Sequence, residues 1–354
     1  DIMADEAPIS SLSHVTPVSN RRTMRAMEFV GTGAEHNLLK AERKIPWPKG
    51  HEVLLKVEAA GVSRIDVEQR LGLTHAPKGV SPLPGLEIAG EIVSIGLDVR
   101  QFREGQLVCA FVSGGGYAEF AVAAASACLP IPDGLSLAEA SVLPLPLCTA
   151  WNALVRLGRV TSGCSVLLKH GAGCVARSSI FLCKTLGASV FAVCSAADRE
   201  LCRRYGADQV IDSEGDMVQA VMELTEGRGV DVILDVDGDG LDANLNALCS
   251  DGRLILLGPV GETTTAHMNI RKLMEKRVAL HGANLRAEPC SVVAEIVAGM
   301  RDKLWPSLNI PGPLTDPIRS AVSQTFPLED AAEAHRLMRS PLRTRITLLI
   351  GQIG

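Results

Sequence analysis

The segment from Ser165 to Ala192 constrains the fold more than any other part of the chain. A short apolar run at 166–168 stops at the glycine-rich segment 171–173, and apolar residues then recur at helical spacing as far as Gly187. A second apolar run begins at Ser189. This order of strand, tight turn, helix and strand predicts one βαβ unit.

The turn of this unit fits the pattern G-x-G-x-x-A. Gly171 allows a sharp turn, Gly173 lets the backbone approach a pyrophosphate, and Ala176 lets the helix pack closely on the strand. The first N–H groups of the helix, at Cys174 and Val175, then face the phosphates. The pattern therefore predicts a dinucleotide site made by Gly171, Gly173, Cys174, Val175 and Ala176. The alternative is an ordinary strand-to-helix turn, because the motif alone is weakly specific.

The rest of the chain predicts two domains of different class. Strands and helices alternate from Val166 to about Arg286, which is typical of a doubly wound parallel sheet. Before that segment, short strands are closely spaced and the triplet Gly114-Gly-Gly116 predicts a hairpin turn, so we expect a small barrel-like domain. Residues 1–23 are polar and without periodicity, and we expect a disordered leader there. A late strand at 345–350 is expected to return to the first domain.

Composition excludes several functional classes. The chain of 354 residues has a net charge of −5, so nothing in the total charge favours nucleic acid or an anionic membrane. No apolar run approaches the roughly 20 residues needed to cross a bilayer. The ten cysteines show no C-x-x-C spacing, which argues against a zinc ribbon or a redox pair. Reduced thiols and a cytoplasmic location are the expectation.

Several ordered segments together resemble one family. They read AAGVSRIDVEQRLG at 59–72, PGLEIAGEIVSIG at 84–96, GGYAEF at 115–120, GADQVID at 206–212 and GVDVILDVDG at 229–238. With the glycine turn, this series resembles the zinc-independent quinone oxidoreductase branch of the medium-chain dehydrogenase/reductases. The resemblance covers the chain from about Met24 to its C-terminus.

The resemblance implies an architecture. It consists of a GroES-like β-barrel domain, 24–147 with 304–354, and an inserted Rossmann domain with a doubly wound parallel sheet, 148–303. The nicotinamide is expected in the cleft between them, and a homodimer is expected through the edge of the Rossmann sheet. Further residues matching the family's cofactor-binding positions are Gly258, Gly261, Asn284, Leu285 and, as a phosphate contact from the tail, Arg345. Asp235 is a further candidate because it lies at a strand end, where cofactor sites form.

A catalytic zinc is not expected. Zinc-dependent members of the superfamily need a Cys and a His from the β domain, but the matching segments here read Gly61-Val-Ser63 and Gly85-Leu86-Glu87. Because zinc needs thiolate or imidazole donors, we predict no metal. Glu87 is expected to be structural, paired within the cleft.

The expected cofactor is NADP rather than NAD. The second strand of the Rossmann domain ends at Ser195, where NAD enzymes usually carry an acidic residue. Ser195 and Arg199 are suited to a 2′-phosphate, whereas Asp198 would repel one. Asp198 is interpreted either as a helix N-cap or as a ribose ligand.

Ser63 and Thr149 are the candidate catalytic residues. Ser63 stands where relatives often have Asn, and Thr149 matches a threonine near the nicotinamide. Neither is an acid at neutral pH, so water is expected to protonate the product, and both hydroxyls are otherwise only positional. Cys174 departs from a family glycine. Its thiol pKa could fall near the helix N-terminus, although a tolerated small residue is the simpler interpretation.

Direct hydride transfer from NADPH to a small-molecule quinone is the predicted function. An enone or alkenal reductase needs the same geometry and stays open. So does a catalytically weak NADPH-binding sensor, structural or RNA-associated protein, because Ser63, Glu68, Thr74, Cys174 and Asp198 all depart from family patterns.

Overall fold

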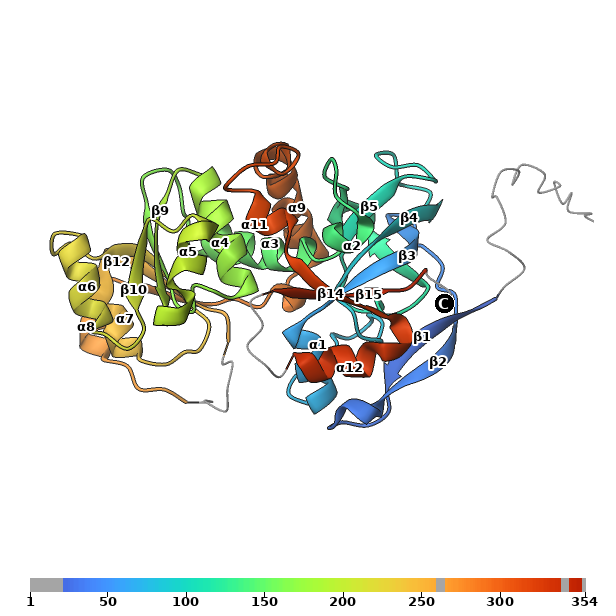
Figure 1. Cartoon of the computed structure of the whole chain (residues 1–354), viewed down its shortest axis with the longest axis horizontal. Coiled ribbons are helices and arrows are strands. Elements are labelled where there is room, and N and C mark those ends of the chain that lie inside the picture. Colours follow the sequence, from blue (N-terminus) through green and yellow to red (C-terminus); the bar gives the residue numbers. More distant parts are fainter. Residues whose placement is uncertain (1–21, 259–264, 339–343, 352–354) are drawn as a thin grey trace, which may run out of the picture.

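The computed structural model describes residues 22–258, 265–338 and 344–351. Two α/β bodies lie side by side along the long axis of the molecule (Figure 1). One is built on a parallel six-stranded sheet and the other on a largely antiparallel seven-stranded sheet. The predicted combination of a Rossmann domain with a GroES-like domain is confirmed.

The parallel sheet has the strand order β10-β9-β8-β11-β12-β13. The order reverses between β8 and β11, and ligands of such sheets bind outside the carboxyl ends of the strands at this point. Its strands are β8 (Ser165–Leu168), β9 (Ser189–Cys194), β10 (Gln209–Asp212), β11 (Val230–Asp235), β12 (Leu248–Leu256) and β13 (Ala279–Gly282). The helices between them are α4 (Cys174–Thr185), α5 (Arg199–Tyr205), α6 (Met217–Leu224), α7 (Leu241–Ala247) and α8 (Ile270–Glu275).

The antiparallel sheet is organised by the long strand β3. The first half of β3 pairs with β6, its last residues pair with β15, and β4 lies on its other edge. The sheet order β14-β15-β3-β4-β5-β7 is an open path among the described strands, so the barrel is not closed by hydrogen bonds there. The strands of this domain are β1 (Thr23–Phe29), β2 (Leu38–Lys44), β3 (Glu52–Val62), β4 (Glu87–Ile95), β5 (Leu107–Phe111), β6 (Phe120–Ala124), β7 (Cys128–Pro130), β14 (Val322–Pro327) and β15 (Arg345–Leu349).

The remaining helices connect and cover the two sheets. They are α1 (Arg64–Leu71), α2 (Leu137–Ala140), α3 (Pro144–Ala150), α9 (Cys290–Lys303), α10 (Trp305–Leu308), α11 (Asp316–Arg319) and α12 (Ala331–Leu337), with a π-helical turn at Trp151–Leu157. The boundary predicted at 147 falls inside α3, which continues into the π-helical turn. The pairing of β15 with β3 confirms that the tail returns to the first domain.

Three sequence expectations need correction. Gly114–Gly116 is not a hairpin turn, because β6 pairs with β3 and not with β5. Thr23, assigned to the leader, begins β1 and pairs with Lys44, while 1–21 lie outside the described residues. One stretch, Leu137–Leu157, is long and apolar enough to cross a membrane by length and composition, but 72% of its apolar 18-residue window is buried inside the molecule. That burial is typical of a core helix.

A buried polar network ties α12 to α1. His335 is fully buried, with Nδ1 3.4 Å from the donating Nε of Arg70 and Nε2 3.2 Å from the hydroxyl of Tyr117. Burial, helped by the charge of Arg70, lowers the pKa of His335 to about 3. The imidazole is therefore neutral in the folded protein at neutral pH.

This lowered pKa predicts a loss of stability in acid. Between pH 6.5 and about 3 the unfolded chain binds a proton at His335 that the folded chain does not. Its contribution is complete above the unfolded pKa and falls as the pH drops, by about 1.4 kcal/mol per pH unit. Urea unfolding from pH 7 to pH 4 should therefore show a shallower pH dependence for His335→Gln than for the wild type. Parallel curves would show that His335 does not titrate as described.

Candidate functional site

The glycine turn leaves the start of α4 open. A Cβ on Gly171 would lie 2.8 Å from the Cβ of Ala192, so only glycine fits. Gly173 is the N-cap of α4, and an added Cβ would meet only the carbonyl oxygen of His170 at 3.7 Å. No side chain caps this helix. Its first N–H groups, beginning with those of Cys174 and Val175, are free to bind an anion. Ala176, in the same first turn, is buried.

A buried guanidinium lies beside this turn. Arg345, on β15, is 5% exposed, and its Nη1 donates to Sγ of Cys174 at 3.6 Å. Its Nη2 forms an ion pair with Glu87, while its Nε has no partner within the described chain. Burial lowers the pKa of Arg345 to about 10, so it remains a cation at neutral pH. The orphaned donor and the open helix start together fit a bound phosphate group.

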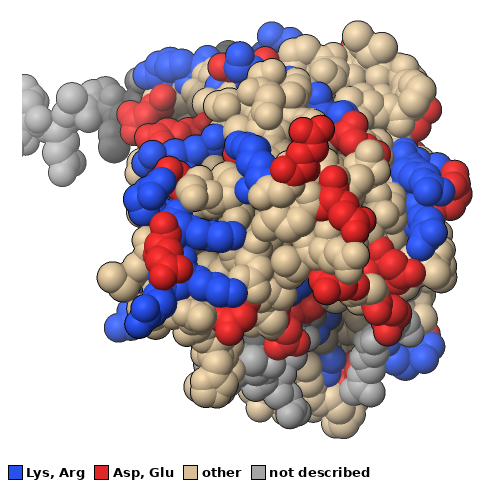
Figure 2. Space-filling model, turned by 90° about the vertical axis from the view of Figure 1, so that its left-hand side faces the viewer, with Lys and Arg blue, Asp and Glu red and all other residues tan. Residues whose placement is uncertain are grey.

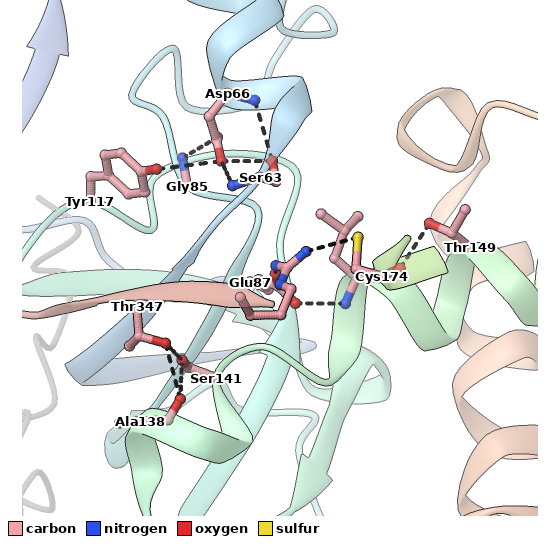
Figure 3. Close-up of polar contacts among 12 residues, drawn as sticks. Ser63, Asp66, Gly85, Glu87, Tyr117, Ala138, Ser141, Thr149, Cys174 and Thr347 are labelled. Atoms are coloured by element: carbon pink, nitrogen blue, oxygen red, sulfur yellow. Dashed lines mark hydrogen bonds and ion pairs between the residues drawn. The ribbon is translucent and has the colours of Figure 1, made fainter. Parts of the chain in front are cut away.

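Glu87 joins the two domains at this point. It is fully buried on β4, and its Oε2 accepts the N–H of Leu145 at 3.0 Å, just inside α3 (Figure 3). Gly61 makes room for it, since a Cβ there would lie 2.5 Å from Oε1. The expectation that Glu87 is structural and paired in the cleft is confirmed. The ion pair connects β4 and β15 of one domain with α3 and α4 at the other.

Cys174 is not a low-pKa thiol. It is half-buried at the first position of α4. Burial raises the pKa of its thiol, and the nearby charge of Arg177 opposes this only in part. The suggestion that the helix N-terminus lowers this pKa is wrong, because desolvation outweighs the helix charge.

The carboxyl ends of β11, β12 and β13 meet next to the turn. Asp235 is fully buried, where it accepts the N–H of Gly238 at 3.1 Å and the Nζ of Lys169 at 2.9 Å. It thereby shapes the loop after β11. Gly258 has φ 111° and open space around it, Leu285 is buried, and Asn284 is exposed. Gly261 lies outside the described residues.

The end of β9 carries both a hydroxyl and a carboxylate. Oγ of Ser195 donates to Oδ2 of Asp198 at 2.9 Å, and Nη2 of Arg199 lies 3.3 Å from Oδ2 of Asp212. Asp198 stands at the N-cap position of α5, but its side chain makes no capping hydrogen bond there. Asp198 therefore lies at the N-cap position, as one interpretation predicted, but its side chain does not cap the helix.

Ser63 is turned away from open space. It is 2% exposed at the N-cap of α1, and its hydroxyl donates to Oδ2 of Asp66 at 2.7 Å. Asp66 also accepts the N–H of Gly85 at 2.8 Å, and burial raises the pKa of its carboxyl. Figure 3 shows this cluster apart from Thr149, whose hydroxyl donates to the carbonyl oxygen of Leu145 at 2.8 Å. The Ser-x-x-Asp spacing of a capping box was the available signal for Asp66.

Sequence reasoning also missed the side chain of Arg286. It follows Leu285 and is 8% exposed, and its Nε and Nη2 donate to the carbonyl oxygen of Ser113 at 3.1 and 3.0 Å. Its Nη1 is buried with no partner in the part of the chain that the structure describes. Burial lowers the pKa of Arg286, and the charge of Asp66 opposes that shift. A cation with an unused donor thus lies between the two domains.

Comparison with known proteins decides the family. Residues 49–133 match the family described as alcohol dehydrogenase GroES-like domain, and 174–298 match zinc-binding dehydrogenase. Quinone oxidoreductase of Rattus norvegicus is 30% identical over 322 residues, covering 89% of this chain and 92% of the relative. The chain belongs to the quinone oxidoreductase family, within the medium-chain dehydrogenase/reductases. It is an enzyme of this type that uses a nicotinamide cofactor.

Solved structures agree with this assignment. A mycobacterial quinone oxidoreductase superposes with a TM-score of 0.77 at 28% identity, covering 92% of this chain and 100% of that one. JamJ enoyl reductase in its apo form gives a TM-score of 0.77 at 25% identity, over 92% of this chain and 99% of that one. Similar folds therefore serve both kinds of acceptor.

The side chains available to coordinate a metal are relevant to the prediction that no zinc is bound. The segments Gly61-Val-Ser63 and Gly85-Leu86-Glu87, which resemble those that supply Cys and His in zinc-dependent members, contain neither residue. The described residues hold no group of three His, Cys, Asp or Glu side chains that could bind a metal. Zinc independence stays a prediction. A nicotinamide dinucleotide, in contrast, fits the open helix start and the orphaned Arg345 donor.

Proposed function

We propose that this enzyme reduces a quinone by direct hydride transfer from NADPH in the cleft between its two domains, without a metal. The observation that carries the proposal is buried Arg345, whose unused Nε lies on a guanidinium that already contacts Cys174 at the uncapped start of α4. The bound nicotinamide supplies the hydride. The chain binds both partners and orients them at reacting distance.

Separate groups of residues are proposed to bind the pyrophosphate, the nicotinamide and the acceptor. Gly171, Gly173, Cys174, Val175 and Ala176 present the start of α4 to the pyrophosphate, with Arg345 beside them. We place the nicotinamide half against Asn284, Leu285 and Thr149, with Gly258 after β12 and Asp235 positioning the loop after β11. Gly261 is also proposed to contact the nicotinamide, although it lies outside the described residues. Ser63 keeps its proposed role as a hydroxyl of the acceptor side. Because a carbonyl oxygen only accepts hydrogen bonds, that role requires the Ser63 hydroxyl to turn its proton from Asp66 toward the acceptor oxygen.

Arg286 is proposed to bind the acceptor oxygen. Hydride addition to a quinone or an enone places negative charge on a carbonyl oxygen, and a positioned donor in a dry site stabilises that charge strongly. The Nη1 of Arg286 is such a donor, since it is buried and without a partner among the described residues. Water remains the proposed source of the proton.

A quinone and an enone are distinguished by turnover. We expect oxidation of NADPH with an ortho-quinone at a higher kcat/KM than with a straight-chain alkenal. The enoyl reductase similarity at 25% identity supports the enone as the second candidate. A higher kcat/KM with the alkenal would reverse the assignment. No turnover of either acceptor, with tight NADPH binding, would favour a sensor or structural role.

Asp198 is expected to set the choice between NADPH and NADH. Ser195 and Arg199 support a 2′-phosphate, whereas the carboxylate 2.9 Å from the Ser195 hydroxyl opposes it. Removing one unit of like charge near a phosphate gains about 1.4 kcal/mol, roughly tenfold in affinity. Asp198→Asn should therefore raise NADPH affinity about tenfold and leave NADH unchanged or weaker, measured by fluorescence titration. Equal gains for both nucleotides would place Asp198 outside the ribose site.

A homodimer and a cytoplasmic location complete the proposal. β13 is an edge strand, and Leu280 on it is 38% exposed. Ile270 and Met274 of α8, the helix that precedes β13 in the chain, are exposed as well. A second copy would cover these apolar groups, and light scattering would then give twice the mass of 37.5 kDa. All ten cysteines are free, which suits a reducing compartment. Figure 2 shows acidic and basic side chains intermingled on the Rossmann end, which supports a small-molecule substrate over nucleic acid.

A further inference from the structure

A hollow opens on the β domain and borders the proposed acceptor site, because Ser113 lines the hollow and accepts hydrogen bonds from Arg286. Its volume is about 740 Å³, within the range of pockets that bind small organic molecules. Strand β6, the loops 79–83 and 111–115, and the start of α9 form its walls. None of the residues proposed above to bind the cofactor or the acceptor lines it.

The interior of this hollow is apolar. Its apolar lining residues include Phe111 and Val112 at the end of β5, Phe120 and Ala121 on β6, and Val293 on α9. Four of these five residues are buried, yet their side chains still border the hollow. A hydrocarbon chain placed there would lose contact with water, which is the main source of affinity for an apolar ligand.

The rim of the hollow carries an excess of positive charge. Lys44 and Lys49 line it, and neither ammonium forms an ion pair or hydrogen bond with another residue of the described ranges. Arg43 is also there, paired with Glu28. Of the two acidic lining residues, Glu288 is paired with Arg156 and Glu52 accepts the N–H of Lys49 at 2.8 Å. A backbone N–H does not cancel the charge of Glu52, so the charged residues that line the hollow sum to one positive charge. The ammonium groups of the two lysines remain available to an anion, and exposed Trp47 also lines the hollow.

We propose that this hollow binds an amphipathic anion, with an unbranched apolar chain along β6 and a carboxylate head group at Lys44 and Lys49. An apolar interior with a basic rim is complementary to a ligand that has both an apolar chain and an anionic head group. A plain hydrocarbon would leave the rim unused, and a small inorganic anion would leave the interior unused. The site goes beyond the proposed reductase activity, because its walls and the cofactor cleft share no assigned residue.

Cys290 gives a probe of this hollow. It lines the hollow and is exposed, whereas the other nine cysteines are buried or half-buried. An environment-sensitive maleimide dye on Cys290 should shift its emission when dodecanoate is added below its micelle-forming concentration. Cys290→Ser, which takes up no dye there, is the labelling control. Calorimetry on the unlabelled full chain should give saturable binding of dodecanoate and binding of neutral dodecan-1-ol that is roughly fivefold weaker.

Paired variants test the two halves of the site. Lys44→Gln/Lys49→Gln should reduce dodecanoate affinity to that of dodecan-1-ol, whereas the exposed control pair Lys40→Gln/Lys303→Gln should not. Val122→Trp, which fills the hollow from half-buried β6, should abolish binding of both, whereas Leu97→Trp, at an 86% exposed site outside it, should not. Circular dichroism confirms that each variant is folded.

Three results would overturn the proposal. They are unchanged dodecanoate affinity in the folded double lysine variant, unchanged affinity with the hollow filled, and displacement of dodecanoate by NADPH. The last would place the ligand in the cofactor cleft instead. Failure of the reductase assay alone leaves these binding measurements intact, so the two proposals fail separately.

Discussion

Replacing Arg345 with leucine is expected to lower the free energy of unfolding by about 3–5 kcal/mol, because it leaves a buried carboxylate without its cation. Glu87 is fully buried, so water cannot replace the lost cation, and among the described residues its carboxylate would keep only the N–H of Leu145 as a partner. The same change removes the guanidinium beside the start of α4. NADPH affinity should fall by about 1.5–3 kcal/mol, roughly tenfold to a hundredfold.

A second substitution separates the two effects. In Glu87→Gln/Arg345→Leu no charge is left buried at this place, and the glutamine oxygen can still accept the N–H of Leu145. Most of the lost stability should therefore return, while NADPH affinity should stay low. Urea unfolding and fluorescence titration measure these quantities independently. If the double variant also regains NADPH affinity, Arg345 acts only as the partner of Glu87 and does not contact the cofactor.

The sequence pattern predicted those parts of the fold that depend on residues close together in the chain. The βαβ unit could be assigned from 165–192 because strand, turn and helix follow one another within a single stretch. The doubly wound parallel sheet follows from the alternation of strands and helices, whereas its strand order comes from the structure. The pairing of β6 with β3 could not be assigned in this way. Partners far apart in sequence leave no local mark, so Gly114–Gly116 was interpreted as a hairpin turn.

The site shows the same limit at the level of single atoms. Sequence placed Arg345 at a phosphate and Glu87 in a paired position, and the structure joins them through one ion pair. The sequence could not show which way a hydroxyl points. Ser63 was chosen for its hydroxyl, which the fold commits to Asp66. It also could not show which donors are left unused, because that depends on every neighbour of a side chain at once.

Arg286→Gln is expected to lower kcat for the quinone by roughly 10²–10³, the usual cost of removing one donor to a developing oxyanion. The charge and the free Nη1 donor both disappear. NADPH affinity should stay within about twofold, because Arg286 is bonded to Ser113 and not to the glycine turn. Stopped-flow measurement of NADPH oxidation under saturating quinone reports the hydride step directly.

Arg286→Lys is the matched variant for this prediction. It keeps the positive charge and one strong donor but loses the forked geometry that lets Arg286 bind Ser113 and an acceptor oxygen together. We expect an intermediate kcat, recovered by about tenfold over Arg286→Gln. A purely structural role would instead give both variants the same kcat once their unfolding curves match. A change in KM alone would mean that Arg286 only holds the acceptor, because an interaction made equally in ground and transition states leaves kcat unchanged.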